Sequence, residues 1–161
     1  MSDSKETYLE YCQRAYKLFG LSSFSDPELP EVICTDAHTP QRFLALYAQS
    51  SESNLLNKLA SNPNTPQDVL AGLAYHYETS VRVMTASNSR ISVALSESLA
   101  LDESCSVRHS VASNLSSSVE ALRLLRTDLN RFVSKRANNT LDKLKTMSFP
   151  LSNTDQKEVQ A

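Results

Sequence analysis

Residues 55–62 of the chain read LLNKLASN, and a related octapeptide returns three times further along. It reads VRVMTASN at 81–88, VRHSVASN at 107–114 and FVSKRANN at 132–139. The closing asparagines are spaced by 26, 26 and 25 residues, and they form a column made of Asn62, Asn88, Asn114 and Asn139. Self-similarity at a fixed spacing of this length is typical of proteins built from stacked structural units.

Each octapeptide predicts a short amphipathic helix that ends at the asparagine. Apolar side chains recur at its first and fifth positions, as in Leu55 and Leu59, and a small residue such as Ala60 follows. Asparagine tolerates the left-handed backbone conformation, and its amide satisfies polar groups of a turn. We therefore interpret the asparagine column as a structural turn feature. A ligand-binding strip is the alternative.

A second short helix is expected after each asparagine. Thr65 followed by Pro66 is a typical helix start, and Ser117 with Glu120 has the spacing of a capping box. Only two glycines occur, and no segment alternates as a strand would. Helices this short are marginal in water unless neighbours pack on them. The sequence thus predicts an all-α solenoid, a stack of helix pairs with a period of about 26 residues.

Three regions are expected along the chain. Residues 1–24 would hold a capping helix over 5–20 that ends at Gly20 and covers the first unit, where Phe43 and Leu46 would otherwise be exposed. Residues 25–148 would hold the helical repeats, with a first, degenerate copy around Asp36. Residues 149–161 are polar and are predicted to be a flexible tail.

Composition narrows the classes of function. The net charge of −2 provides no general attraction for nucleic acid or anionic lipid. No segment approaches the ~20 apolar residues of a membrane span, and Met1 to Glu6 lack the pattern of a secretory signal. The three cysteines show no CxxC spacing, which argues against a disulfide framework or a zinc ribbon. A cytoplasmic location is expected.

The octapeptides and their surroundings resemble the leucine-rich repeat variant family, whose bacterial members look like HEAT-type helical repeats. The resemblance covers about residues 29 to 141, and the residues that carry it are Leu59 to Pro66 with Val69-Leu70, and Leu99 to Asp102 with Val107-Arg108 and Ala112 to Asn114. It implies a right-handed superhelix of helix pairs, one helix of which can take 3₁₀ form. The family's first described member carries an iron–sulfur cluster on N-terminal cysteines. Clustered cysteines do not precede the repeats here, so no cofactor is predicted.

HEAT-type repeats also use an Asp and an Arg six residues apart to bond neighbouring repeats. Asp102 and Arg108 match that spacing, whereas Arg82 follows His76. The resemblance therefore implies an incomplete structural ladder made of Asp102 and Arg108. For Arg82 and Arg108 we expect pairing between repeats, with Asp102 and neighbouring carbonyl groups. Phosphate contacts are the alternative role, and the lack of net basicity weighs against them.

Nothing in the sequence favours catalysis or metal binding. The histidines, His38, His76 and His109, fall in different units, and no pair has the i, i+4 spacing of a helical zinc site. Two glycines are too few for a phosphate-binding loop or a nucleotide-binding motif. We predict that the protein is not an enzyme and needs no metal.

One local anomaly points to a binding surface. The loop of the second unit reads Tyr-His-Tyr at 75–77, whereas we interpret the corresponding loops of the other units as small and polar. Val83 and Met84 follow at positions where the neighbouring units have polar residues. Aromatic residues and methionine are favoured in protein interfaces. The predicted contact residues are Tyr75, His76, Tyr77, Val83, Met84 and His109. The simpler alternative is that Tyr75 packs on the adjacent loop and Met84 fills a gap.

The function that these observations favour is a non-catalytic scaffold or adaptor that binds a protein partner. The competing function is nucleic-acid binding, as in the HEAT-like DNA glycosylases. Basic residues gather between Arg123 and Lys145, and we interpret them as a solvated surface patch. The absence of tryptophan and the net charge of −2 weigh against it. An enzyme acting on a small molecule ranks third, and no membrane association is expected.

Overall fold

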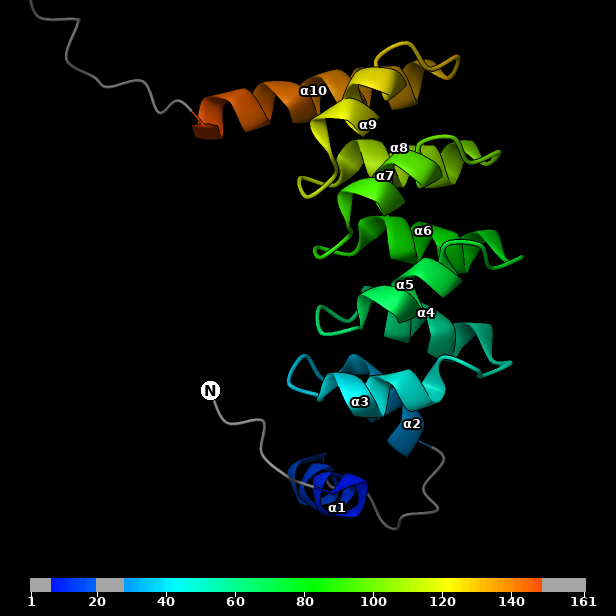
Figure 1. Cartoon of the computed structure of the whole chain (residues 1–161), viewed down its shortest axis with the longest axis vertical. Coiled ribbons are helices and arrows are strands. Elements are labelled where there is room, and N and C mark those ends of the chain that lie inside the picture. The colour runs from blue at the N-terminus through cyan, green and yellow to red at the C-terminus, as the bar shows by residue number, and fades with distance from the viewer. Residues whose placement is uncertain (1–6, 20–27, 149–161) are drawn as a thin grey trace, which may run out of the picture.

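A computed structural model describes residues 7–19 and 28–148, and every regular element in these two segments is a helix. The prediction of an all-α chain is therefore confirmed for the described residues, among which no strand occurs. Figure 1 shows the helices following one another along the long axis in chain order. They are α1 (Tyr8–Phe19), α2 (Leu29–Thr35), α3 (Gln41–Leu44), the 3₁₀ helix η1 (Ala45–Tyr47), α4 (Ser53–Ser61), α5 (Gln67–Leu73), α6 (Thr79–Ser87), α7 (Val93–Leu99), α8 (Cys105–Ser113), α9 (Val119–Leu125) and α10 (Arg131–Ser148).

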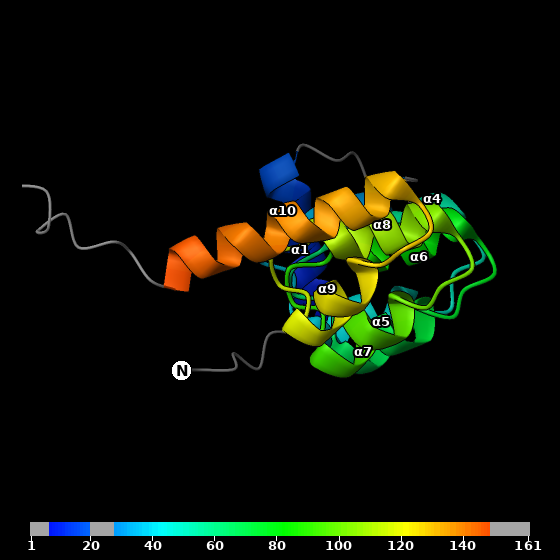
Figure 2. The ribbon, with the colours of Figure 1, turned by 90° about the horizontal axis from the view of Figure 1, so that it is seen from above.

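The helices from α4 to α10 form two layers. Seen from above in Figure 2, α4, α6, α8 and α10 lie together on one side, and α5, α7 and α9 lie on the other. In the first layer, α2 packs on α4, α4 on α6, α6 on α8 and α8 on α10. Each of α4, α6 and α8 has nine residues, so none is long enough to be stable alone in water. Contacts between neighbours must supply the stability.

The core runs between the two layers and repeats every 26 residues. Cys34, Ala60, Ala86 and Ala112 are fully buried at equivalent positions, where a larger side chain would keep neighbouring helices apart. Larger apolar side chains fill the space around this small column, and the fully buried ones include Leu56, Leu59, Leu70, Val81, Val107, Val111 and Leu122. Burial of a side chain of this size contributes about 1.5–3 kcal/mol relative to exposure.

Three members of the asparagine column link each unit to the one before it. Asn88 directly follows α6 and is 2% exposed. Its Nδ2 donates to the carbonyl oxygens of Ala60 and Asn62, at 2.6 and 2.9 Å, and its Oδ1 accepts from the backbone N–H of Arg90 at 2.8 Å. Asn62 and Asn114 make the same three bonds one unit earlier and one unit later. The amide thus ends one helix and bonds to backbone left open at the end of the previous one.

The fourth member, Asn139, does not end a helix. It is exposed and lies inside α10, which continues to Ser148. Thr140 occupies the position 26 residues after Asn114, is 3% exposed, and donates from its hydroxyl to the carbonyl oxygen of Ala112 at 2.6 Å. The spacing of 26 is therefore kept in the last unit, and the predicted alignment with Asn139 was wrong by one residue. The Thr140 hydroxyl makes this bond from within α10, and the chain does not turn there.

The predicted caps of the second helices also differ from the structure. Pro66 and Pro40, not the preceding threonines, are the N-cap residues of α5 and α3. The hydroxyls of Thr65 and Thr39 are buried and donate backward to the carbonyl oxygens of Leu59 and Ile33. A hydroxyl between two helices can cap the start of the second helix or bond to a carbonyl oxygen at the end of the first. Here both threonine hydroxyls bond to the end of the first helix.

Helix α1 packs on the first unit at the N-terminal end of the chain. The rings of Tyr8 and Tyr11 lie 5.2 and 5.1 Å from the ring of Phe43, which is 4% exposed. Burial raises the pKa of Tyr11 to about 12, and its hydroxyl donates to Asp36 at 3.1 Å. Leu46, expected to be covered as well, stays 62% exposed. The predicted stop at Gly20 and the predicted tail 149–161 lie outside the described residues.

Candidate interaction surface

Three loops that lead from the second layer back to the first lie along one edge of the molecule, on the right in Figure 1. They join α5 to α6, α7 to α8 and α9 to α10. Each loop has a residue that accepts the backbone N–H two positions later: His76 Nδ1 from Glu78 at 3.2 Å, Asp102 Oδ1 from Ser104 at 2.8 Å, and Asp128 Oδ1 from Asn130 at 2.8 Å. A histidine nitrogen therefore takes the place of a carboxylate oxygen in the first loop, and the three turns keep a similar form.

Two arginines connect these loops. Arg82 donates through Nε and Nη2 to the carboxylate of Asp102, at 2.8 and 3.1 Å, and through Nη1 to the carbonyl oxygens of His76 and Tyr77, at 2.9 and 3.0 Å. Four of its five N–H groups are thus used inside the protein. The side chains of Arg82 and Asp102 are each 9% exposed. This leaves little of the guanidinium for the alternative role in phosphate binding.

Arg108 repeats the arrangement one unit later. It donates to the carboxylate of Asp128 at 2.7 and 3.2 Å, and to the carbonyl oxygens of Asp102 and Glu103 at 2.8 and 3.0 Å. The hydrogen bond from Arg108 lowers the pKa of Asp128 and raises that of Arg108 itself. Asp102 and Arg108, the predicted ladder residues, are therefore each bonded to a neighbouring unit. Their side chains are not bonded to each other, because the Asp102 carboxylate points back to Arg82.

Between these arginine–aspartate pairs, the loops and the first turn of α10 expose large apolar side chains. We call this set the loop-edge strip. In the described segments it includes every large hydrophobic residue that is more than 70% exposed, while the next, Leu18, is 69% exposed. Its members are Tyr75 at 76%, Tyr77 at 79%, Leu101 at 73%, Leu129 at 103% and Phe132 at 71%. Exposed apolar residues gathered along one edge mark a surface for contact with another molecule.

The six predicted contact residues differ in how exposed they are. Tyr75 and Tyr77 are exposed in the strip, and the Tyr75 hydroxyl lies 3.2 Å from that of Ser98 on α7. His76 is half-buried, and its ring centre lies 4.4 Å from that of Tyr77. Val83 and Met84 are half-buried and pack against core clusters, which for Met84 agrees with the simpler alternative. His109 is exposed on α8 and lines a shallow hollow with Phe132.

Sequence reasoning missed Leu101, Leu129 and Phe132. The loops that contain the two leucines were interpreted as small and polar, although a leucine stands beside the aspartate in each one. An apolar residue next to a turn-forming aspartate is the sequence feature that could have indicated these exposed positions. Whether such a residue packs inward or faces solvent depends on the direction of the turn, which the sequence alone does not reveal.

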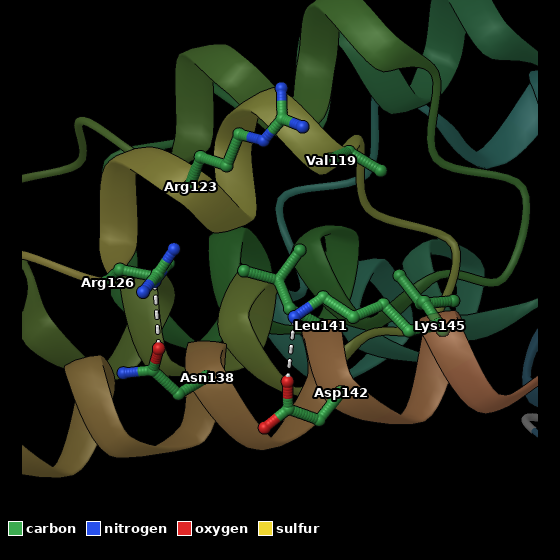
Figure 3. A pocket seen from close by; sticks show the side chains of 8 residues that line it. Val119, Arg123, Arg126, Asn138, Leu141, Asp142 and Lys145 are labelled. Carbon is green, nitrogen blue, oxygen red and sulfur yellow. Dashed lines mark hydrogen bonds and ion pairs between the residues drawn. The ribbon is translucent and has the colours of Figure 1, made fainter.

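A second surface feature lies between α9 and α10. It is an open groove of about 440 Å³ whose lining side chains come from both helices, as Figure 3 shows. Arg126 Nε donates to Asn138 at 2.9 Å, and Lys145 pairs with Asp142 at 3.0 Å. Arg123 and the apolar side chains of Val119, Leu141 and Leu144 form the rest of the lining.

Two kinds of site were not found in the parts of the chain that the structure describes. None of the helices there is both long and apolar enough to cross a bilayer. The same residues contain no group of three or more His, Cys, Asp or Glu side chains arranged to hold a metal ion.

Comparisons with protein-family models, with curated proteins and with solved structures found no match to this chain. The features described above are therefore the basis for assigning a function.

Proposed function

We propose that this protein is a helical-repeat solenoid of the leucine-rich repeat variant or HEAT-like type, and that it acts as a non-catalytic scaffold which binds a protein partner. Three observations support the repeat assignment. Buried small residues recur every 26 positions, each first-layer helix packs on the next, and the amides of Asn62, Asn88 and Asn114 make equivalent bonds to the preceding unit. Proteins built this way use exposed positions for binding, because substitutions there leave the stack intact.

The loop-edge strip is the observation that carries the binding assignment. Tyrosine, phenylalanine and leucine side chains together offer apolar area and, through the tyrosine hydroxyls, polar contacts. The loops beneath them are held by Arg82 and Arg108 through ion pairs whose side chains are at most 19% exposed. A surface that is rigid before binding loses less conformational entropy when a partner docks. We therefore expect the strip to be the centre of a protein interface.

An affinity purification with paired variants tests this function. Tyr77→Ser combined with Leu129→Ser removes apolar area from the strip, whereas Val93→Ser combined with Leu124→Ser removes apolar area from second-layer helices, where these residues are 61% and 47% exposed. Tagged proteins are expressed in the native cells, and co-purifying proteins are quantified by mass spectrometry. The scaffold function predicts a partner that the strip variant loses at unchanged melting temperature and the control variant keeps. Equal recovery with both variants would remove the strip from consideration.

A further inference from the structure

The groove between α9 and α10 exists because the last unit ends differently from the others. In earlier units the chain leaves the first-layer helix at Asn62, Asn88 or Asn114. In the last unit Thr140 stays within α10, and the helix runs on to Ser148. Figure 2 shows this second half of α10 extending past the other helices. It provides a wall beside α9 that no earlier unit has among the residues described.

The groove combines apolar side chains with positive charge. Val119, Leu141 and Leu144 provide the aliphatic part of its lining. Three cations also line it, namely Arg123 on α9, Arg126 directly after α9, and Lys145 on α10. Asp142 is the one carboxylate in the lining. Residues 119–148 carry seven Lys or Arg and three Asp or Glu, a net charge of +4, in a chain whose net charge is −2. The positive potential is thus concentrated at this end of the molecule.

We infer that this groove binds an acidic peptide segment of a partner protein, with one aliphatic side chain of the segment placed against Val119, Leu141 and Leu144. Carboxylates on either side of that side chain would face Arg123 and Lys145. A guanidinium offers paired N–H groups that match a carboxylate, so Arg123 and Arg126 suit this ligand better than lysines would. The side chains of Arg123 and Lys145 are 67% and 74% exposed, which leaves both accessible to a ligand.

An acidic peptide fits the groove better than a nucleic-acid strand does. Proteins that bind single strands stack the bases on aromatic side chains, and the lining of this groove contains no aromatic residue. The aliphatic side chains of the lining cannot form hydrogen bonds with a phosphate backbone, but they can pack against a leucine, isoleucine or valine side chain. This site is separate from the loop-edge strip in its residues, so the two surfaces can be tested independently.

Fluorescence anisotropy with the full chain tests the inference. The probe is a fluorescein-labelled peptide with one leucine between runs of glutamate, and we expect a dissociation constant on the order of 10 μM at low salt. Arg123→Gln combined with Lys145→Gln should weaken binding about tenfold or more. The matched control is Arg131→Gln combined with Lys135→Gln, which removes the same charge from exposed positions of α10 outside the groove and should change affinity less than about twofold.

Two further probes make the result specific. A peptide with serine in place of leucine should bind at least about fivefold more weakly, since an apolar contact is lost. A labelled oligothymidylate should bind more weakly than the leucine peptide. The inference is overturned by equal weakening with both double variants, by indifference to the leucine, by tighter binding of the oligonucleotide, or by no peptide binding at all. If the double variant of the groove melts early, Arg123→Gln alone, with Arg131→Gln as its control, replaces it. A negative result here leaves the test of the loop-edge strip unaffected.

Discussion

Arg108 and Asp128 form a two-bond ion pair, at 2.7 and 3.2 Å, across 20 residues of sequence and between two neighbouring units. Arg82 and Asp102 do the same one unit earlier. At the opposite edge of the molecule, the left in Figure 1, the first-layer helices turn into the second-layer helices. Asn88 and Asn114 end α6 and α8 at these turns, and their amides make the equivalent connection. Neighbouring units are therefore tied at both edges, with the small-residue column packed between them.

Asn88→Ala should lower the free energy of unfolding by about 2–3 kcal/mol. The substitution removes two buried bonds to Ala60 and Asn62 and the acceptor for the Arg90 N–H, and it leaves buried carbonyl oxygens without their donor. Asn139→Ala is the control, because Asn139 is exposed within α10. Urea unfolding followed by circular dichroism measures both. Equal effects of the two substitutions would mean that the column has no special structural role.

Arg108→Lys should destabilise the protein by about 1–3 kcal/mol although the charge is kept. A lysine ammonium cannot reach the Asp128 carboxylate with two parallel bonds and still bond to the carbonyl oxygens of Asp102 and Glu103. Arg123→Lys is the matched control, since Arg123 is 67% exposed and paired with Glu120 only at 3.7 Å. Thermal melts of the two variants should separate clearly, and coincident melts would contradict the proposed importance of the fork geometry.

Stability should fall with acid partly through Asp128. Arg108 lowers the pKa of Asp128 in the folded protein, so the folded state holds the ionised form more strongly than the unfolded state does. This stabilisation is complete above the unfolded value of about 3.9 and is lost as the pH falls below it through the folded value. The stability difference between the wild type and Asp128→Asn should therefore shrink between about pH 5 and pH 2. A difference that stays constant over that range would contradict this prediction.

Cysteine reactivity should separate the three thiols. Cys34 is fully buried, and burial raises the pKa of its thiol to about 12, so little of the reactive thiolate is present near neutral pH. Cys12 is 1% exposed, and burial raises its pKa too, whereas Cys105 is exposed on α8. N-ethylmaleimide followed by mass spectrometry should modify Cys105 first and the other two only on unfolding. Modification of Cys34 as fast as Cys105 would contradict the packing of the small-residue column.

The core was the most predictable part of the fold, and the last unit was the least. Positions such as Ala60, Ala86 and Ala112 are fully buried and accept only small side chains, so the 26-residue spacing is visible in the sequence. The adjacent residues Asn138, Asn139 and Thr140 offered two possible alignments, and matching asparagine to asparagine chose the wrong one. The Leu-Asp-Lys-Leu-Lys run that follows Thr140 lacks the proline or serine found after the other asparagines, and it favours a continued helix.

The sequence predicted only part of the candidate surface, because an apolar residue in a turn and one on a helix differ in how often they face solvent. The Tyr-His-Tyr sequence at 75–77 is conspicuous because aromatic residues are uncommon in turns, and the structure places Tyr75 and Tyr77 in the strip. Val83 and Met84 were also predicted to contact a partner, because they are apolar where neighbouring units are polar. They are half-buried, since an apolar residue on a helix is equally suited to packing in the core. Arg82 pairs with Asp102 and a neighbouring carbonyl group, as the sequence led us to expect. The pairing of Arg108 with Asp128 was not expected, because it depends on how the units stack.

Site-specific photo-crosslinking in the native cells tests the central claim most directly, because it records which residues touch a partner. The photoreactive amino acid p-benzoylphenylalanine replaces Tyr77 or Leu129 in the loop-edge strip, or Ala94 on α7 as an exposed control. We predict that positions 77 and 129 capture the same protein and that position 94 does not. Capture of that protein from position 94 alone, or of different proteins from 77 and 129, would contradict a single interface along the strip.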